Sequence, residues 1–133
     1  MKTKWPDQSR FVASVRKHFG FLIREFGFVE DHTESDWFGT EIAFRGRRTA
    51  VQVEWEVRDK LLSVFVIELV DGAIPPRPVF DTDVSFERWI PIEVLVRQRA
   101  PGHIWQGSRN AFGAATLHER AELLRSHGSD YLK

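Results

Sequence analysis

The sequence predicts a single α+β domain: an antiparallel β-meander of three or more strands, an N-terminal helix packed on it, and two C-terminal helices. Three patterns carry this prediction. Large apolar residues recur at helical spacing over about 9–26, apolar and polar residues alternate over 49–58, and a helix start signal stands at Thr116. A chain of 133 residues is the size of one ordinary domain and is long enough to bury a core.

The N-terminal helix is predicted from apolar residues that recur every three or four positions, which places them on one side of a helix. They are Phe11, Val15, Phe19, Leu22 and Phe26. Gly27 is suited to the left-handed position that follows many helices. Gly20 disfavours a continuous helix, so we expect either one helix with a kink or two short helices in line.

Three strands joined by short polar turns follow, and this arrangement is typical of an antiparallel meander. We expect the strands at about 38–45, 49–58 and 61–70. The second strand has one apolar and one polar face because its side chains alternate with a period of two. Its apolar members are Val51, Val53, Trp55 and Val57.

The positions of the two turns predict the strand register. The first turn places Glu41 opposite Glu54. A second turn centred on 59–60 places Trp55 opposite Val64. Both registers put the apolar residues of the meander on one side, so the N-terminal helix is expected to cover that side.

The second half of the chain begins with a long connection. Residues 71–87 contain several prolines and are expected to form a crossing loop. Pro91 can open a short helix because proline is favoured at the first helical position. The buried side of this helix is expected to consist of Ile92, Leu95 and Val96. Residues 100–112 are predicted to be irregular.

The final helix is predicted from a capping box. In this motif the Thr116 hydroxyl caps the first turn and Glu119 reaches back to the cap residue. Leu117, Ala121 and Leu124 then share the buried face, and Gly128 ends the helix.

The composition excludes several classes of protein. Nineteen Lys and Arg balance nineteen Asp and Glu, and this zero net charge argues against nucleic-acid binding. The absence of cysteine excludes disulfide scaffolds and thiolate chemistry. The first residues lack the apolar core of a signal peptide, and no apolar run reaches the roughly 18 residues that span a bilayer. We therefore expect a cytoplasmic protein without membrane association.

The polar face of the second strand carries an ordered set of acids. Glu54 and Glu56 point the same way, with Glu41 across from Glu54. Like charges opposite each other are destabilising, so a divalent cation, the nearby Arg58 and Lys60, or a basic partner is expected to offset them. The other interpretation is a solvated face, since antiparallel sheets commonly keep one side polar.

A second acidic feature precedes the first strand. Residues 30–36 are expected to form a polar loop without a local cation, and Trp37 and Phe38 follow it. A partner with a basic cleft would find steering charge and an aromatic anchor there. Alternatively, both aromatic residues begin the first strand and pack inward. The acidic residues of the loop are Glu30, Asp31, Glu34 and Asp36.

No catalytic or metal-binding motif is apparent. The five histidines have no helical pair at metal-ligand spacing, and no nucleophile elbow or phosphate-binding loop occurs. No cofactor and no metal are therefore expected. The histidines are His18, His32, His103, His118 and His127.

Three segments together resemble a loose group of small uncharacterised bacterial α+β proteins, some of which are similar to immunity proteins encoded beside polymorphic toxins. The segments are residues 21–28, 53–59 and 121–132, and they cover a helix end, the meander and the terminal helix. The shared motifs are structural, so the resemblance implies a fold and a binding role without implying a catalytic mechanism.

The expected function is therefore a non-enzymatic protein-binding domain, an immunity protein that binds and occludes a bacterial toxin or effector. Its expected contact residues are Glu30, Asp31, Glu34, Asp36, Trp37, Glu41, Glu54 and Glu56. The alternative is a small metal-dependent hydrolase or nuclease that uses Glu41, Glu54, Glu56 and Lys60. A third hypothesis is a structural subunit of a larger assembly, and the sequence leaves the oligomeric state open.

Overall fold

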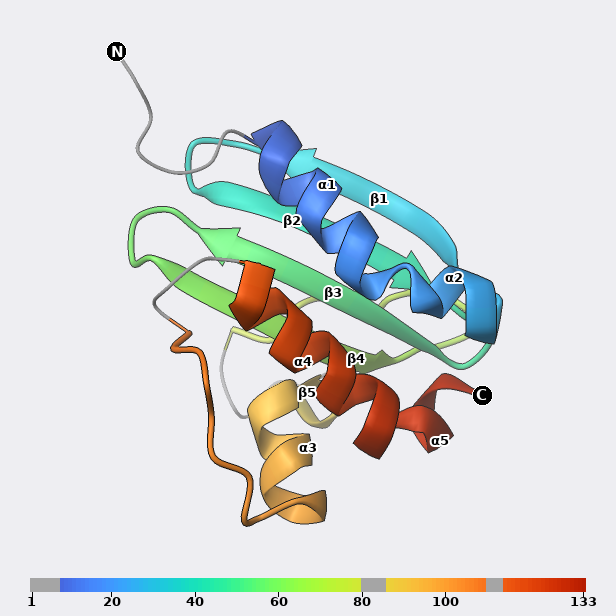
Figure 1. Cartoon of the computed structure of the whole chain (residues 1–133). Helices are drawn as coiled ribbons and strands as arrows, with labels where there is room; N and C mark the ends of the chain where they lie inside the picture. The colour runs from blue at the N-terminus through green and yellow to red at the C-terminus, as the bar shows by residue number, and fades with distance from the viewer. Residues whose placement is uncertain (1–7, 80–85, 110–113) are drawn as a thin grey trace.

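The computed structural model describes residues 8–79, 86–109 and 114–133. Its centre is a five-stranded antiparallel sheet in the order β1-β2-β3-β4-β5, and α1 and α4 lie across one face of it (Figure 1). This arrangement confirms the predicted α+β class, with an N-terminal helix on a meander and helices at the C-terminal end. Within the described ranges, no helix is long and apolar enough to cross a membrane.

The helices and strands follow one another in a simple order along the chain. They are α1 (Gln8–Phe19), α2 (Phe21–Phe26), β1 (Val29–Ser35), β2 (Gly39–Arg45), β3 (Thr49–Glu56), β4 (Leu61–Glu68), the 3₁₀ helix η1 (Phe86–Arg88), β5 (Trp89–Pro91), α3 (Ile92–Arg99), α4 (Ala114–His127) and α5 (Ser129–Leu132).

The N-terminal segment forms two consecutive short helices, which was one of the two predicted alternatives. The break falls at Gly20, where an added Cβ would lie 2.8 Å from the carbonyl oxygen of Arg16, so a side chain has no room there. Gly27 ends α2 in the left-handed conformation (φ 74°) as predicted, and its N–H donates to the carbonyl of Ile23. The predicted apolar side faces the core, where Phe11, Val15, Phe19 and Leu22 are buried and Phe26 is partly buried.

The register of the first hairpin is confirmed, and that of the second is shifted by two residues. Glu41 lies opposite Glu54 as expected. Trp55 lies opposite Leu62 and not Val64, because residues 57–60 form a longer connection between β3 and β4. A shift of two residues keeps every side chain on its own face, so the predicted apolar side is unaffected.

The segment predicted as an acidic loop is instead the edge strand β1. Apolar alternation is the usual sequence signal of a strand. Most of β1 is exposed and has little apolar surface to bury, so it lacks that signal. Charged residues are common on edge strands because they discourage unwanted pairing with other sheets. A bulge interrupts the pairing with β2 between Glu30 and His32.

The predicted crossing loop leads into a short fifth strand. Residues 80–85 of the 71–87 segment lie outside the described residues, but η1 follows them and β5 pairs with β4. Pro91 precedes α3 as its N-cap residue and not as its first helical residue, whereas the burial of Ile92, Leu95 and Val96 is as expected. Residues 100–109 contain no regular element, as predicted, whereas 110–112 are outside the described part of the chain.

The predicted capping box of the last helix is wrong. α4 already includes Ala114, so Thr116 lies within the helix and is buried. The Glu119 carboxylate accepts hydrogen bonds from the backbone N–H groups of Gln106 and Gly107, so it fixes the preceding loop. The predicted buried face is confirmed for Leu117, Ala121 and Leu124, and Gly128 follows the end of α4.

The two faces of the sheet are covered very differently. The helices bury one face of β2–β4 in the main core. On the opposite face, a smaller cluster gathers around Trp89 at the β4–β5 side. The neighbouring part of that face, over β1 to β3, carries mostly polar side chains and forms the candidate site. The smaller cluster consists of Ala50, Ile67 and Trp89, with Phe65, Leu69 and Ile74 packed against it.

Candidate functional site

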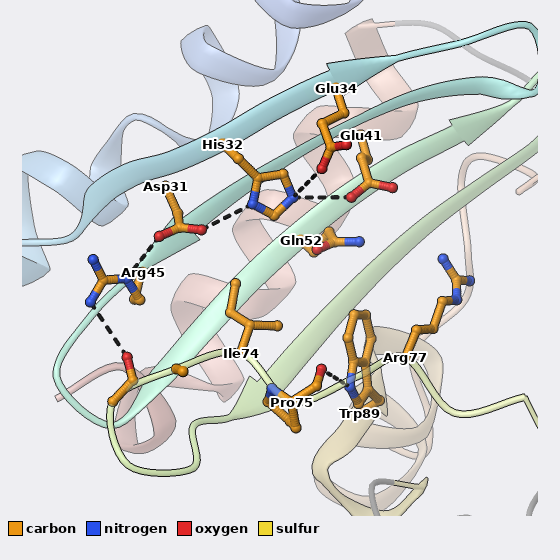
Figure 2. Close-up of a pocket in the computed structure, with 12 residues that line it drawn as sticks. Asp31, His32, Glu34, Glu41, Arg45, Gln52, Ile74, Pro75, Arg77 and Trp89 are labelled. Atoms are coloured by element: carbon orange, nitrogen blue, oxygen red, sulfur yellow. Dashed lines mark hydrogen bonds and ion pairs between the residues drawn. The ribbon is translucent and has the colours of Figure 1, made fainter.

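The candidate site is the polar side of β1, β2 and β3, which we call the acidic face. Alternation along the strands places its side chains away from α1 and α4. Segment 72–77 borders it on the β4–β5 side (Figure 2). The acidic face consists of Asp31, His32, Glu34, Glu41, Glu54 and Glu56.

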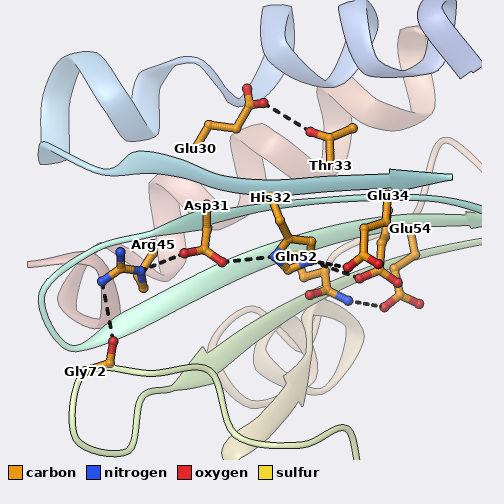
Figure 3. Close-up of polar contacts among 10 residues, drawn as sticks. Glu30, Asp31, His32, Thr33, Glu34, Arg45, Gln52, Glu54 and Gly72 are labelled. Carbon is orange, nitrogen blue, oxygen red and sulfur yellow. Dashed lines mark hydrogen bonds and ion pairs between the residues drawn. The ribbon is translucent and has the colours of Figure 1, made fainter.

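The bulge in β1 separates Glu30 from the acidic face. Glu30 pairs with Phe44, which belongs to the helix-covered core, whereas His32 pairs with Ala43 on the opposite side. Figure 3 shows Glu30 directed toward the helices and Asp31 directed away from them. The Glu30 carboxylate accepts two hydrogen bonds of 2.8 Å from Arg16 of α1, and these bonds lower its pKa. Glu30 is therefore a tether for β1, although it was predicted as a partner contact.

Asp31 and His32 begin a chain of polar contacts along β1. Asp31 Oδ2 lies 3.0 Å from His32 Nδ1, and Asp31 Oδ1 accepts a 2.9 Å hydrogen bond from Arg45 Nε. The contacts with His32 and Arg45 lower the pKa of Asp31. Both Glu30 and Asp31 thus have an arginine partner, and each partner lies 14 positions away in the sequence and outside the acidic segment.

His32 stands between three carboxylates. Its Nε2 lies 3.0 Å from Glu41 Oε2 and 3.8 Å from Glu34 Oε2, while its Nδ1 faces Asp31 (Figure 2). Burial lowers the pKa of His32, but the hydrogen bonds to Asp31 and Glu41 outweigh burial, so the pKa is raised overall. His32 is therefore the group that offsets the negative charge of Glu41. The sequence predicted that such a group is needed but did not identify it.

The Glu54 carboxylate contacts one buried side chain and one arginine from a distant part of the chain. Gln52 Nε2 donates to Glu54 Oε2 at 2.6 Å, and the Gln52 side chain is almost fully buried. Arg77 Nη1 lies 2.5 Å from the same carboxylate. Arg77 thus offsets the charge of Glu54, and it is a residue that the sequence-based alternatives did not name.

Glu56 and Lys60 lie toward the β3–β4 turn. The hydrogen bond between Glu56 and Asp59 is the main cause of a raised pKa at Glu56, with burial as the second cause. Lys60 occupies the turn with a left-handed backbone (φ 49°) and does not line either of the two pockets described next. Of the alternative catalytic set, Glu41, Glu54 and Glu56 therefore line the smaller pocket together, and Lys60 lies outside it.

Two adjoining pockets open over the acidic face. The larger has a volume of about 520 Å³ and lies between β1–β3 and segment 72–77 (Figure 2). The smaller has a volume of about 360 Å³ and extends to the tip of the β1–β2 hairpin. Carboxylates dominate the charged groups of the smaller pocket, which contains Glu34, Asp36, Glu41, Glu54, Glu56 and Arg77.

Trp37 and Phe38 form an exposed aromatic pair at the tip of the β1–β2 hairpin. Trp37 is 78% exposed and Phe38 is 46% exposed. Their rings stack with 3.8 Å between centroids. The Asp36 carboxylate accepts hydrogen bonds from the backbone N–H groups of Phe38 and Gly39, which shapes the turn. The alternative that both aromatic residues pack inward is therefore wrong.

Sequence reasoning identified most of the carboxylates of this site but missed three of its residues. His32 had one usable signal, since it alternates with Glu34 and so shares a side with it on any strand. Gln52 likewise alternates with Glu54. Arg77 had no local signal, because it comes from a loop that reaches the sheet only in the folded chain.

Comparisons with known proteins add no assignment. No protein-family model matches this chain, and neither a curated protein nor a solved structure matches it. The function is therefore inferred from the acidic face and the aromatic pair beside it.

Proposed function

We propose that the chain is a non-enzymatic protein-binding domain, an immunity protein of the cytoplasm that occludes a bacterial toxin or effector. The observation that carries this proposal is the exposed stack of Trp37 on Phe38 at the rim of the acidic face. Aromatic residues in such positions are enriched among the residues that dominate binding energy at protein interfaces. The partner would present an apolar pocket bordered by basic groups.

The aromatic pair is well suited to act as an anchor. Stacking limits the freedom of both rings before binding, so less side-chain entropy is lost when a partner covers them. Asp36 holds the turn that presents the pair through its two backbone hydrogen bonds. An exposed tryptophan also loses unfavourable contact with water when it enters a partner's pocket.

The charges around the pair favour a basic partner. Glu34 is 73% exposed, and together with Glu56 it borders the same pocket as Phe38. A face of one sign steers an oppositely charged partner toward it and suppresses association with other acidic surfaces. Glu30 is not included in this contact surface because it points toward the helices (Figure 3), where Arg16 contacts its carboxylate.

The proposal can be tested by capture from the native host at low salt, with mass spectrometry of the retained proteins. The test compares wild type with Trp37→Ala/Phe38→Ala and with Ile104→Ala, which removes an equally exposed apolar side chain (77%) from a different segment. We expect one basic protein to be retained stoichiometrically by wild type and by the Ile104 variant, and to be lost from the aromatic variant. With the purified partner, the aromatic variant should bind at least about 30-fold more weakly, which corresponds to about 2 kcal/mol.

Two results would count against the proposal. Retention of the same proteins by all three variants would remove the aromatic pair from binding. Self-association that disappears in the aromatic variant would favour the structural-subunit hypothesis instead. Because Phe38 is only 46% exposed, the free energy of unfolding of the double variant is measured in parallel, which separates misfolding from a loss of binding.

The alternative, a hydrolase or nuclease built on Glu41, Glu54, Glu56 and Lys60, is less well supported. Glu54 already contacts Arg77 and Gln52, and a carboxylate held in this way is a poor candidate for a metal ligand. An assay for metal-dependent hydrolysis that loses activity in Glu54→Gln would restore this alternative.

A further inference from the structure

The acidic face brings together three side chains whose ligand atoms suit a metal ion. One ligand atom each of His32, Glu34 and Glu41 lies within 4.8 Å of the other two. Glu34 and Glu41 face each other across the β1–β2 pair, and His32 is two residues before Glu34 on the same strand. The regular alternation of β1 between His32 and Glu34 therefore directs the imidazole and both carboxylates into the same space (Figure 2).

We propose that His32 Nε2, Glu34 and Glu41 form a binding site for a divalent transition-metal ion of the Zn²⁺ type. Imidazole nitrogen with two carboxylate oxygens is a donor set that Zn²⁺ and Mn²⁺ accept, whereas Ca²⁺ and Mg²⁺ favour oxygen donors alone. Ligand atoms around a tetrahedral Zn²⁺ stand about 3.3 Å apart, since each bond is about 2.0–2.2 Å. The separations of 3.0 and 3.8 Å from His32 Nε2 to the two carboxylates bracket this value.

Asp31 provides an observation that is independent of the three ligands. The Asp31 carboxylate lies 3.0 Å from His32 Nδ1, where it can accept an Nδ1–H hydrogen bond. With a hydrogen on Nδ1, Nε2 is the ring nitrogen that can bind a metal ion, and it faces Glu41. Metal-bound histidines characteristically have such a carboxylate behind the other ring nitrogen, where it fixes the tautomer and the ring orientation. Arg45 in turn holds Asp31 through a 2.9 Å hydrogen bond (Figure 3).

The contact between His32 and Glu41 shows which group a metal ion would replace. His32 Nε2 lies 3.0 Å from Glu41, so a hydrogen on Nε2 would be shared with that carboxylate. A metal ion in its place would contact Nε2, Glu41 and Glu34 together.

The surroundings leave room for a further ligand. All three residues line the pocket of about 520 Å³ on the acidic face. Three protein ligands leave one tetrahedral position open to that pocket, which can take water or a group from a partner. The proposed site is separate from the proposed anchor, because neither Trp37 nor Phe38 is a ligand.

The test uses the full chain with any affinity tag removed and with metal stripped by EDTA and dialysis. Zn²⁺ is titrated at about pH 7.5 by calorimetry, with Mg²⁺ as the comparison ion, and thermal melting is followed in parallel. We expect one Zn²⁺ per chain and a melting midpoint that rises with Zn²⁺, since a ligand bound only by the folded state stabilises it. Mg²⁺ should produce neither effect.

Four variants assign the binding to this site. His32→Asn and Glu41→Gln should reduce the affinity for Zn²⁺ more than tenfold. Asp31→Asn keeps all three ligands and should reduce the affinity by about 10–100-fold through the lost orientation of His32. His118→Asn is the control, because His118 packs against His18 with 5.6 Å between ring centroids and the two imidazoles form an alternative pair of ligands. This variant should bind Zn²⁺ as wild type does.

The outcomes separate the possibilities. Absence of saturable Zn²⁺ binding at millimolar concentration would overturn the proposal and leave a proton as the charge shared by His32 and Glu41. Binding that is unchanged in His32→Asn, or lost in His118→Asn, would overturn it as well. The variant Trp37→Ala/Phe38→Ala is expected to bind Zn²⁺ as wild type does. Failure of the protein-binding proposal can therefore be distinguished from failure of the metal site.

Discussion

Glu41 and Glu54 lie directly opposite each other on β2 and β3, and each carboxylate has its own partner on the acidic face. His32 Nε2 lies 3.0 Å from Glu41, and Arg77 contacts Glu54. Two like charges at a directly opposed position are destabilising on a bare sheet. The tertiary structure offsets them with one group from β1 and one from the loop before β5.

Removing Arg77 is expected to expose this repulsion. Arg77→Met keeps the apolar stem of the side chain near Phe65 and Trp89 but removes the charge. Because Arg77 is half-exposed, we expect a loss of only about 1 kcal/mol in the free energy of unfolding, measured by urea denaturation at low salt.

The double variant Arg77→Met/Glu54→Gln is the control for that measurement. It removes the unpaired charge and should recover most of the lost stability. Added salt should also reduce the penalty in the single variant, because screening weakens the repulsion between Glu41 and Glu54. A double variant as unstable as the single one would show that Arg77 acts through packing and not through charge.

Gly39 at the start of β2 is expected to tolerate no side chain. A Cβ at this position would lie 1.9 Å from the backbone carbonyl oxygen of Trp55, and the backbone must shift to accept it. Gly39→Ala should therefore lower the free energy of unfolding by on the order of 2 kcal/mol, as overpacking does. Gly102→Ala is the matched control, because a Cβ at Gly102 meets no atom within 4 Å. Equal stability of the two variants in urea would contradict this reading of the hairpin.

Glu119 is expected to make the stability of the fold depend on acid pH. Burial raises its pKa, but hydrogen bonds from Gln106, His103 and Gly107 outweigh burial, so its folded-state pKa is lowered. The stabilisation is then present above the unfolded-state pKa, about 4.3, and is lost as pH falls through the folded-state pKa. Wild type should lose stability between pH 5 and pH 3.

The variant Glu119→Gln isolates this effect in urea unfolding at pH 7, 5 and 3. It should be less stable than wild type at pH 7, and its stability should fall less between pH 5 and pH 3. Glu122→Gln, an exposed carboxamide substitution on the same helix, should follow the wild-type pH dependence. A pH dependence in Glu119→Gln as steep as in wild type would assign the acid sensitivity to other carboxylates.

Local pattern was a reliable guide to the elements that bury an apolar side. The helical face from Phe11 to Leu22 and the alternation over Val51 to Trp55 both lie in the core as predicted. The same reasoning failed at β1, since an exposed edge strand such as 29–35 has no apolar face to reveal it. It also failed at Thr116, because a capping motif is satisfied only if the helix begins there.

The candidate site was predicted in part, because some of its residues are placed by local pattern alone. Glu41, Glu54 and Glu56 share one side of the sheet because strand alternation and the first turn dictate it. The exposed position of the Trp37 and Phe38 rings was one of two interpretations left open by the sequence, and the hairpin tip decided between them.

The sequence by itself determined the α+β class, the first hairpin register and the acidic side of the sheet. These features depend on alternation and on turns a few residues long, so neighbouring residues specify them. Only the tertiary structure decided which partner each acid has, as in the contacts of Glu30 with Arg16 and of Glu54 with Arg77. Such contacts join residues 14 and 23 positions apart, and their formation depends on how whole elements pack against the sheet.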